Sequence, residues 1–96
     1  MKAVVLITDS EAMGGFERAL MEASDRGFTV VPTVWGRGRS GLKAGDRIHP
    51  GASSLLFSVL PEDDLPATLA LLRRVREESG TPEETRLYVT DVDEIF

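Results

Sequence analysis

The residues best suited to bind an anion gather in one segment, WGRGRSGLKAGDRIHPG at positions 35–51. It holds five of the nine glycines, four of the eleven basic side chains, the only Trp and the only His. Glycine lets a backbone N–H approach an anion closely, and arginine adds a charge-assisted contact at two points. The segment therefore predicts a binding loop for a small anion. A solvated basic loop is the alternative, because this Gly-rich stretch lacks P-loop spacing.

Catalysis and metal binding have less support from the residue types. The chain has no cysteine, and His49 has no second histidine to complete a metal site. No Ser/His/acid set is indicated by spacing. We therefore expect no metal and no catalytic residue. A small enzyme with His49 as base, and Arg39 or Arg47 holding an acidic substrate, is an open alternative.

Four apolar runs predict strands and two amphipathic segments predict helices. The expected strands are 3–7, 28–35, 53–60 and 86–92, and the expected helices are about 11–26 and within 61–80. Gly14 and Gly15 each weaken the first helix by about 1 kcal/mol, so its firm part is expected to begin near Phe16. Pro32 lacks an N–H and therefore places the second strand at a sheet edge or at a bulge.

The order of these elements, βαββαβ, predicts a single α+β domain over residues 1–96. Two βαβ units with right-handed crossovers fold most simply into a ferredoxin-like arrangement, a four-stranded antiparallel sheet with both helices on one face. The expected strand order is fourth, first, third, second. Strands one and three are apolar at successive positions, so the second face is expected to be covered by other subunits. A monomer with an exposed apolar face is the alternative.

Charge and composition narrow the class of partner. The formal net charge is −5, which disfavours nucleic acid as a partner. The apolar run near the N-terminus is too short for a signal peptide or a membrane span, so we expect a cytoplasmic protein. The chain contains no Asn and no Gln, a weak hint of a thermophilic source.

A string of short motifs resembles the PII signal-transduction proteins and their PII-like relatives. GFTVVPTVWGRGRSG (27–41) is similar to the strand that leads into the PII T-loop, with Gly36, Gly38 and Arg39 on its Gly-x-Gly-Arg signature. LFSVLPEDDLPATLALL and TRLYVTDVDEI resemble the next strand-to-helix passage and the last strand. RSGLKAGDRIHPGASSLLF is closest to a divergent branch with a shortened T-loop.

This resemblance implies a regulatory homotrimer that binds an effector in clefts between subunits. Signalling to a target, such as a membrane transporter or an enzyme, is expected through the 39–51 loop. The stem 35–40 is expected to contact ligand, and 41–51 to become ordered when ligand or partner binds. The expected ligand-binding residues are Gly36, Arg37, Gly38, Arg39, Ser40, Gly41 and Arg86, and the expected partner-binding residues are Lys43, Arg47 and His49.

The acidic residues near the expected site indicate which effector fits. Glu83 and Glu84 lie where the family has a Gly-rich basic loop, and Asp93 and Glu94 lie where it has arginines. These carboxylates would repel a triphosphate. We therefore expect an adenine nucleotide with fewer phosphates, bicarbonate or another small anion. A CutA-type trimer for divalent-metal tolerance shares the architecture and is the nearer alternative.

Overall fold

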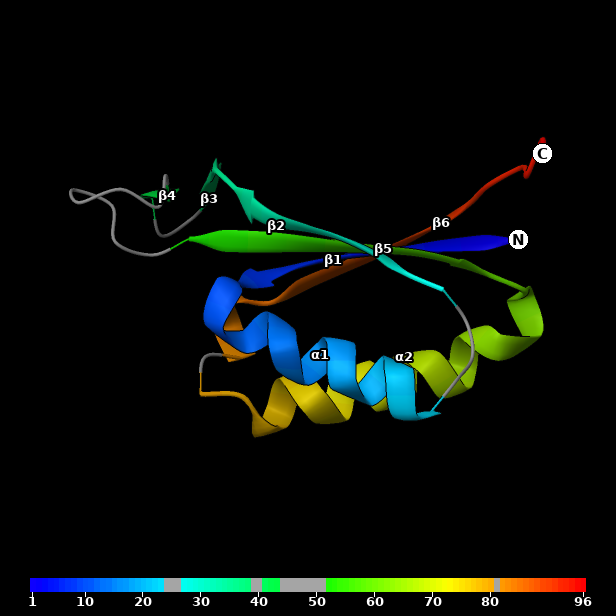
Figure 1. Ribbon diagram of the computed structural model, residues 1–96, viewed down its shortest axis with the longest axis horizontal. Coiled ribbons are helices and arrows are strands. Elements are labelled where there is room, and N and C mark those ends of the chain that lie inside the picture. Colours follow the sequence, from blue (N-terminus) through cyan, green and yellow to red (C-terminus); the bar gives the residue numbers. More distant parts are fainter. Residues whose placement is uncertain (24–26, 39–40, 44–51, 81) are drawn as a thin grey trace.

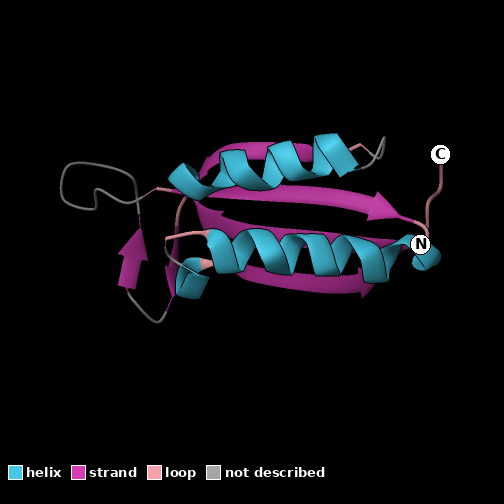
Figure 2. Ribbon diagram, turned by 90° about the horizontal axis from the view of Figure 1, so that it is seen from below, coloured by secondary structure: helices cyan, strands magenta, loops and turns pink. Residues whose placement is uncertain are grey.

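The computed structural model describes residues 1–23, 27–38, 41–43, 52–80 and 82–96. Four strands form an antiparallel sheet in the order β2-β5-β1-β6, and two helices lie side by side on one face of it (Figures 1 and 2). The elements are β1 (Lys2–Asp9), α1 (Ser10–Ala23), β2 (Thr29–Val34), β5 (Ser53–Leu60), α2 (Leu65–Glu78) and β6 (Arg86–Asp91). The ferredoxin-like fold and its strand order are confirmed.

Four shorter elements complete the chain. The single-turn helices η1 (Glu62–Asp64) and η2 (Pro82–Glu84) precede α2 and β6, respectively. Strands β3 (Gly36–Gly38) and β4 (Gly41–Lys43) form a separate two-stranded sheet between β2 and β5. The sequence did not predict this second sheet.

The core lies between the helices and one face of the sheet. Alternate residues of β1 and β5 point to that face, so Leu6 and Leu56 are fully buried. They pack in one cluster with Phe16 of α1 and Leu72 of α2. The helix spacing seen in the sequence therefore places the apolar stripes of both helices on the sheet.

Pro32 accounts for two features of β2. The strand lies at the edge of the sheet, and its pairing with β5 shifts register between Val31 and Val34. An edge position and a bulge both remove the need for the N–H that proline lacks. Both expectations for Pro32 are confirmed.

Helix α1 begins within one residue of its predicted start and continues through both glycines. It starts at Ser10, where the Ser10 N–H donates to the Ala52 carbonyl at 2.9 Å, and it runs through both glycines to Ala23. Burial of Met13 and Phe16 stabilises these first turns against the low helix propensity of glycine. The expectation that the firm helix begins near Phe16 was wrong for this reason. Residues 24–26, which the prediction included, lie outside the described residues.

Gly15→Ala is expected to stabilise the protein by about 0.5–1 kcal/mol. A Cβ at this position would lie 3.5 Å from Cγ1 of Val75 in α2, an ordinary van der Waals distance, while alanine lowers the free energy of the helix. Urea denaturation followed by circular dichroism measures the change. Ala19→Gly on the same helix is the matched control and should lower stability. A loss of stability in Gly15→Ala would show that the helices cannot accept one methyl group here.

The first and last strands are joined at the end where β1 begins. Lys2 Nζ lies 2.6 Å from a carboxylate oxygen of Asp91 and 3.6 Å from one of Glu62, and the Val92 N–H donates to the Met1 carbonyl. The hydrogen bond from Lys2 lowers the pKa of Asp91 and raises that of Lys2. Figure 1 shows that residues 92–96 leave the sheet here, at the end opposite the β3–β4 hairpin.

Candidate functional site

The β3–β4 hairpin contains the described part of the expected ligand loop. Gly36 pairs with Lys43, Arg37 with Leu42, and Gly38 with Gly41. Residues 41–43 thus form the second strand of the hairpin, at the start of the segment that is expected to become ordered on binding. Backbone pairing fixes the positions of Gly36, Arg37 and Gly38 relative to Gly41. The other expected residues of this loop, Arg39, Ser40, Arg47 and His49, lie outside the described residues.

A hydroxyl network holds both ends of the segment that contains the hairpin. Ser54 Oγ and Ser10 Oγ both donate to the Pro32 carbonyl, at 2.5 and 3.2 Å, and the two hydroxyls lie 2.8 Å apart. The bonds join the bulge of β2 to the starts of β5 and α1. The direction in which the chain leaves β2 is therefore set by two serines that sequence reasoning missed.

Trp35 follows β2 directly and is 72% exposed. It is therefore not part of the core of the subunit. An exposed indole ring at this position can contact a ligand base or another subunit.

The turn before β6 is held by two arginines. Arg76 Nε donates to the Pro82 carbonyl at 2.8 Å, and Arg86 Nη1 donates to the Glu83 and Thr85 carbonyls at 2.6 and 3.1 Å. Arg86, an expected ligand residue, thus uses one of its three nitrogen atoms on its own turn. Its other two nitrogen atoms lie outside these bonds and retain donors for an anion.

The hairpin and the turn at η2 lie at the same end of the molecule (Figure 1). The hairpin continues from the sheet, whereas η2 lies on the side of the helices. The described region has two cavities, one between the helices and one between α2 and β6.

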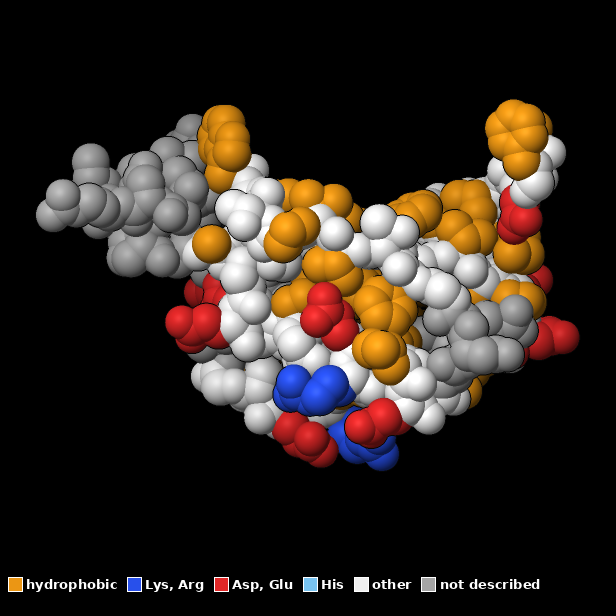
Figure 3. All heavy atoms as spheres, in the orientation of Figure 1, with side chains coloured by type: hydrophobic (Ala, Val, Ile, Leu, Met, Phe, Trp, Pro, Cys, Tyr) orange, Lys and Arg blue, Asp and Glu red, His pale blue; other side chains and the backbone are white. Residues whose placement is uncertain are grey.

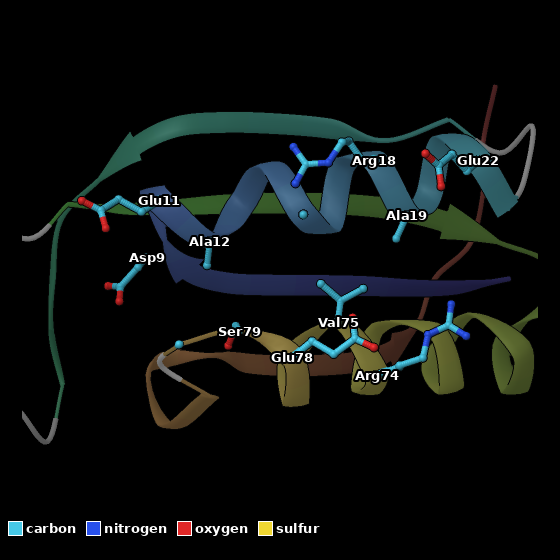
Figure 4. Close-up of a pocket in the computed structure, with 12 residues that line it drawn as sticks. Asp9, Glu11, Ala12, Arg18, Ala19, Glu22, Arg74, Val75, Glu78 and Ser79 are labelled. Atoms are coloured by element: carbon cyan, nitrogen blue, oxygen red, sulfur yellow. The ribbon is translucent and has the colours of Figure 1, made fainter.

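The larger cavity is a groove of about 640 Å³ between α1 and α2. Figure 4 shows Val75 of α2 pointing into it, with Ala12 and Ala19 of α1 on the other side. Two basic residues line it, Arg18 and Arg74, against four acidic ones. The acidic residues are Asp9, Glu11, Glu22 and Glu78. This excess of negative charge makes the groove a poor site for the expected anion.

The face of the sheet away from the helices is apolar. Phe57 lies opposite Val5, and Val5 lies opposite Tyr88, so one row of large side chains crosses three strands. Phe57 is 40% exposed and Tyr88 58%. Figure 3 shows hydrophobic side chains gathered on the sheet side and charged side chains over the helices. A soluble monomer rarely exposes a contiguous apolar face of this kind.

Among the residues that the structure describes, no three His, Asp or Glu side chains come together as a possible metal site. In the same ranges, no helix has both the length and the apolar character needed to cross a membrane.

No family model matches the chain, and no curated protein matches it. Solved structures of CPII, a nitrogen regulatory PII-like protein from Thiomonas intermedia K12, are similar to it. One, bound to ADP, AMP and bicarbonate, has a TM-score of 0.73 at 19% identity over 95% of this chain and 84% of that chain. A second structure with the same ligands has a TM-score of 0.71 at 19% identity, over 95% of this chain and 90% of that chain. A third, bound to ADP and bicarbonate, has a TM-score of 0.72 at 20% identity, over 95% of this chain and 84% of that chain. The chain therefore has the fold of PII-like nitrogen regulatory proteins, as its motifs predicted.

Proposed function

We propose that this chain is a PII-like regulatory protein without enzymatic activity. It forms a homotrimer, binds a small anion in clefts between subunits, and signals through the 39–51 loop to a target such as a membrane transporter or an enzyme. The observation that carries the proposal is the Gly- and Arg-containing hairpin, which extends from the end of a four-stranded sheet with the PII-like fold.

The effector that we propose is ADP, AMP or bicarbonate. All three are bound in CPII structures that share the fold. Arg37 and Arg86 supply positive charge, and the glycines of the hairpin allow close approach of an anion to the backbone. Glu83 and Glu84 lie in or beside the turn that Arg86 holds, and they disfavour a triphosphate.

The homotrimer places this site between subunits. The apolar sheet face supplies a surface that three copies can bury against one another. Assembly would then bring the hairpin of one subunit beside Arg86 of the next. The proposed cleft is thus complete only in the trimer.

A thermal-shift and calorimetry panel of ATP, ADP, AMP and bicarbonate tests the proposal. A ligand at 100 times its dissociation constant stabilises the folded state by about 2.7 kcal/mol, so a clear rise in melting temperature is expected with ADP, AMP or bicarbonate. Arg37→Ala should weaken binding about tenfold or more through loss of a charge-assisted contact. Arg74→Ala removes the same charge from the groove between the helices and should bind as the original chain does.

Other results would favour the alternatives. Stabilisation by copper or zinc, with none by nucleotides or bicarbonate, would support the metal-tolerance trimer. Turnover of an acidic substrate that is lost in His49→Ala would support the small enzyme. Equal loss of binding in Arg37→Ala and Arg74→Ala would place the site away from the hairpin.

A further inference from the structure

The smaller cavity is a cleft of about 390 Å³ between α2 and β6. We call it the arginine cleft. It lies on the helix side of the sheet, because Leu87 and Val89 of β6 pair with Leu6 and Val4 of β1 and share their face. Its apolar lining is entirely aliphatic: Leu6, Leu69, Leu72, Leu87 and Val89. A cleft of this size and lining is suited to a small apolar group.

Three arginines line the same cleft with no acidic residue among its lining residues. Arg73 and Arg76 lie three residues apart on α2 and therefore share one side of the helix, and Arg86 lies on β6. The ion pairs of Lys2 with Glu62 and Asp91 involve none of these three guanidinium groups. In a chain with a net charge of −5, this is a local excess of positive charge above an apolar floor.

Two of the guanidinium groups are held in place before any ligand binds. Arg76 is fixed by the Pro82 carbonyl and Arg86 by the carbonyls of Glu83 and Thr85. Prior ordering of donors lowers the entropic cost of binding an anion. Arg73 is exposed, and no contact fixes it in the described structure. It is therefore free to close over an anionic head group.

We propose that the arginine cleft binds an aliphatic carboxylate, with its acyl chain on the leucine and valine floor and its head group on the arginines. Guanidinium groups bind carboxylates at two points, which suits Arg73 and Arg76. The lining contains no aromatic ring to stack on a nucleotide base, and the Thr85 hydroxyl is engaged with Thr8. Arg86 belongs to both this cleft and the proposed intersubunit anion site, whereas Arg73 and Arg76 line this cleft and are no part of that site.

Isothermal calorimetry with decanoate, below its critical micelle concentration, tests this site on the full chain. One decanoate per chain is expected, and Arg73→Glu should weaken binding about tenfold or more. Arg74→Glu is the matched control, because it makes the same charge change one residue along α2 but lines the other groove. Its affinity for decanoate should stay within about twofold of the original value.

Two ligand controls and one further variant separate the contributions. Decanol lacks the charge and butyrate lacks the chain, so each should bind about tenfold more weakly than decanoate. Val89→Thr keeps the size of the floor but adds a hydroxyl, and it should also weaken decanoate binding. This residue is 39% exposed, so the variant is expected to fold.

Three outcomes would overturn the proposal. Equal losses in Arg73→Glu and Arg74→Glu would mean that only overall charge attracts decanoate. Equal affinities for decanol and decanoate would mean adsorption to apolar surface without recognition of the head group. Displacement of decanoate by ADP, with both ligands weakened by Arg73→Glu, would make the cleft part of the nucleotide site. Failure of ADP to bind at all would count against the proposed function but not against this site.

Discussion

Phe57→Glu is expected to convert the proposed trimer into a monomer of 10.5 kDa. Phe57 lies in the middle of the apolar sheet face, opposite Val5 on β1 and Thr29 on β2. The trimer would bury the part of Phe57 that is still exposed in the subunit, which contributes about 1 kcal/mol per copy, and all three copies are lost together. Burial of an unpaired carboxylate in the interface would cost several kcal/mol more. Multi-angle light scattering should give three times the mass of one chain for the original protein and the mass of one chain for the variant.

Met21→Glu is the control for this experiment. Met21 is 69% exposed on α1, on the helix side of the molecule, and the substitution introduces the same charge into a similarly exposed apolar position. The trimer should survive it. A monomer before any substitution, or a trimer unaffected by Phe57→Glu, would show that the subunits do not associate through the sheet.

The fold was predictable because its signals are local or depend only on the order of elements. Pro32 specified an edge strand or a bulge from its missing N–H, and the structure has both. The run Ser53–Leu60 was predicted with its observed ends, since Gly51 and Pro61 border it. Consecutive apolar residues in β1 correctly indicated that both faces of the strand are apolar, and one of these faces packs in the core.

The candidate site was less predictable because its geometry depends on contacts distant in sequence. Glycine and basic residues have low strand propensity, so nothing in GRG or GLK indicated that β3 and β4 would pair. Ser10, Pro32 and Ser54 meet only after the sheet has formed. In the sequence alone, Arg73 and Arg76 are typical of an ordinary exposed helix end. Their common cleft exists only because β6 packs beside α2.

Thr8→Val and Thr85→Val are each expected to lower the free energy of unfolding by about 1–3 kcal/mol. The two hydroxyls share a hydrogen bond of 2.7 Å, and the residues are only 0% and 4% exposed. Either substitution leaves the other hydroxyl buried without this partner, which costs its full desolvation energy. The double variant removes both polar groups, so its loss should be clearly smaller than the sum of the single losses.

The original chain, the two single variants and the double variant form a double-mutant cycle. Urea denaturation of all four gives the interaction energy between the two hydroxyls, separated from their contacts with the rest of the core. Thr90→Val is the control: the Thr90 hydroxyl is exposed and donates to the next carbonyl at a long distance of 3.4 Å, so a change below about 0.5 kcal/mol is expected. Additive losses would mean that the hydroxyls act independently.

Since Thr85 directly precedes Arg86 and lines the arginine cleft, the single variants should also speed amide exchange at η2. A bond between β1 and this turn would then hold the arginines in place, in addition to stabilising the core.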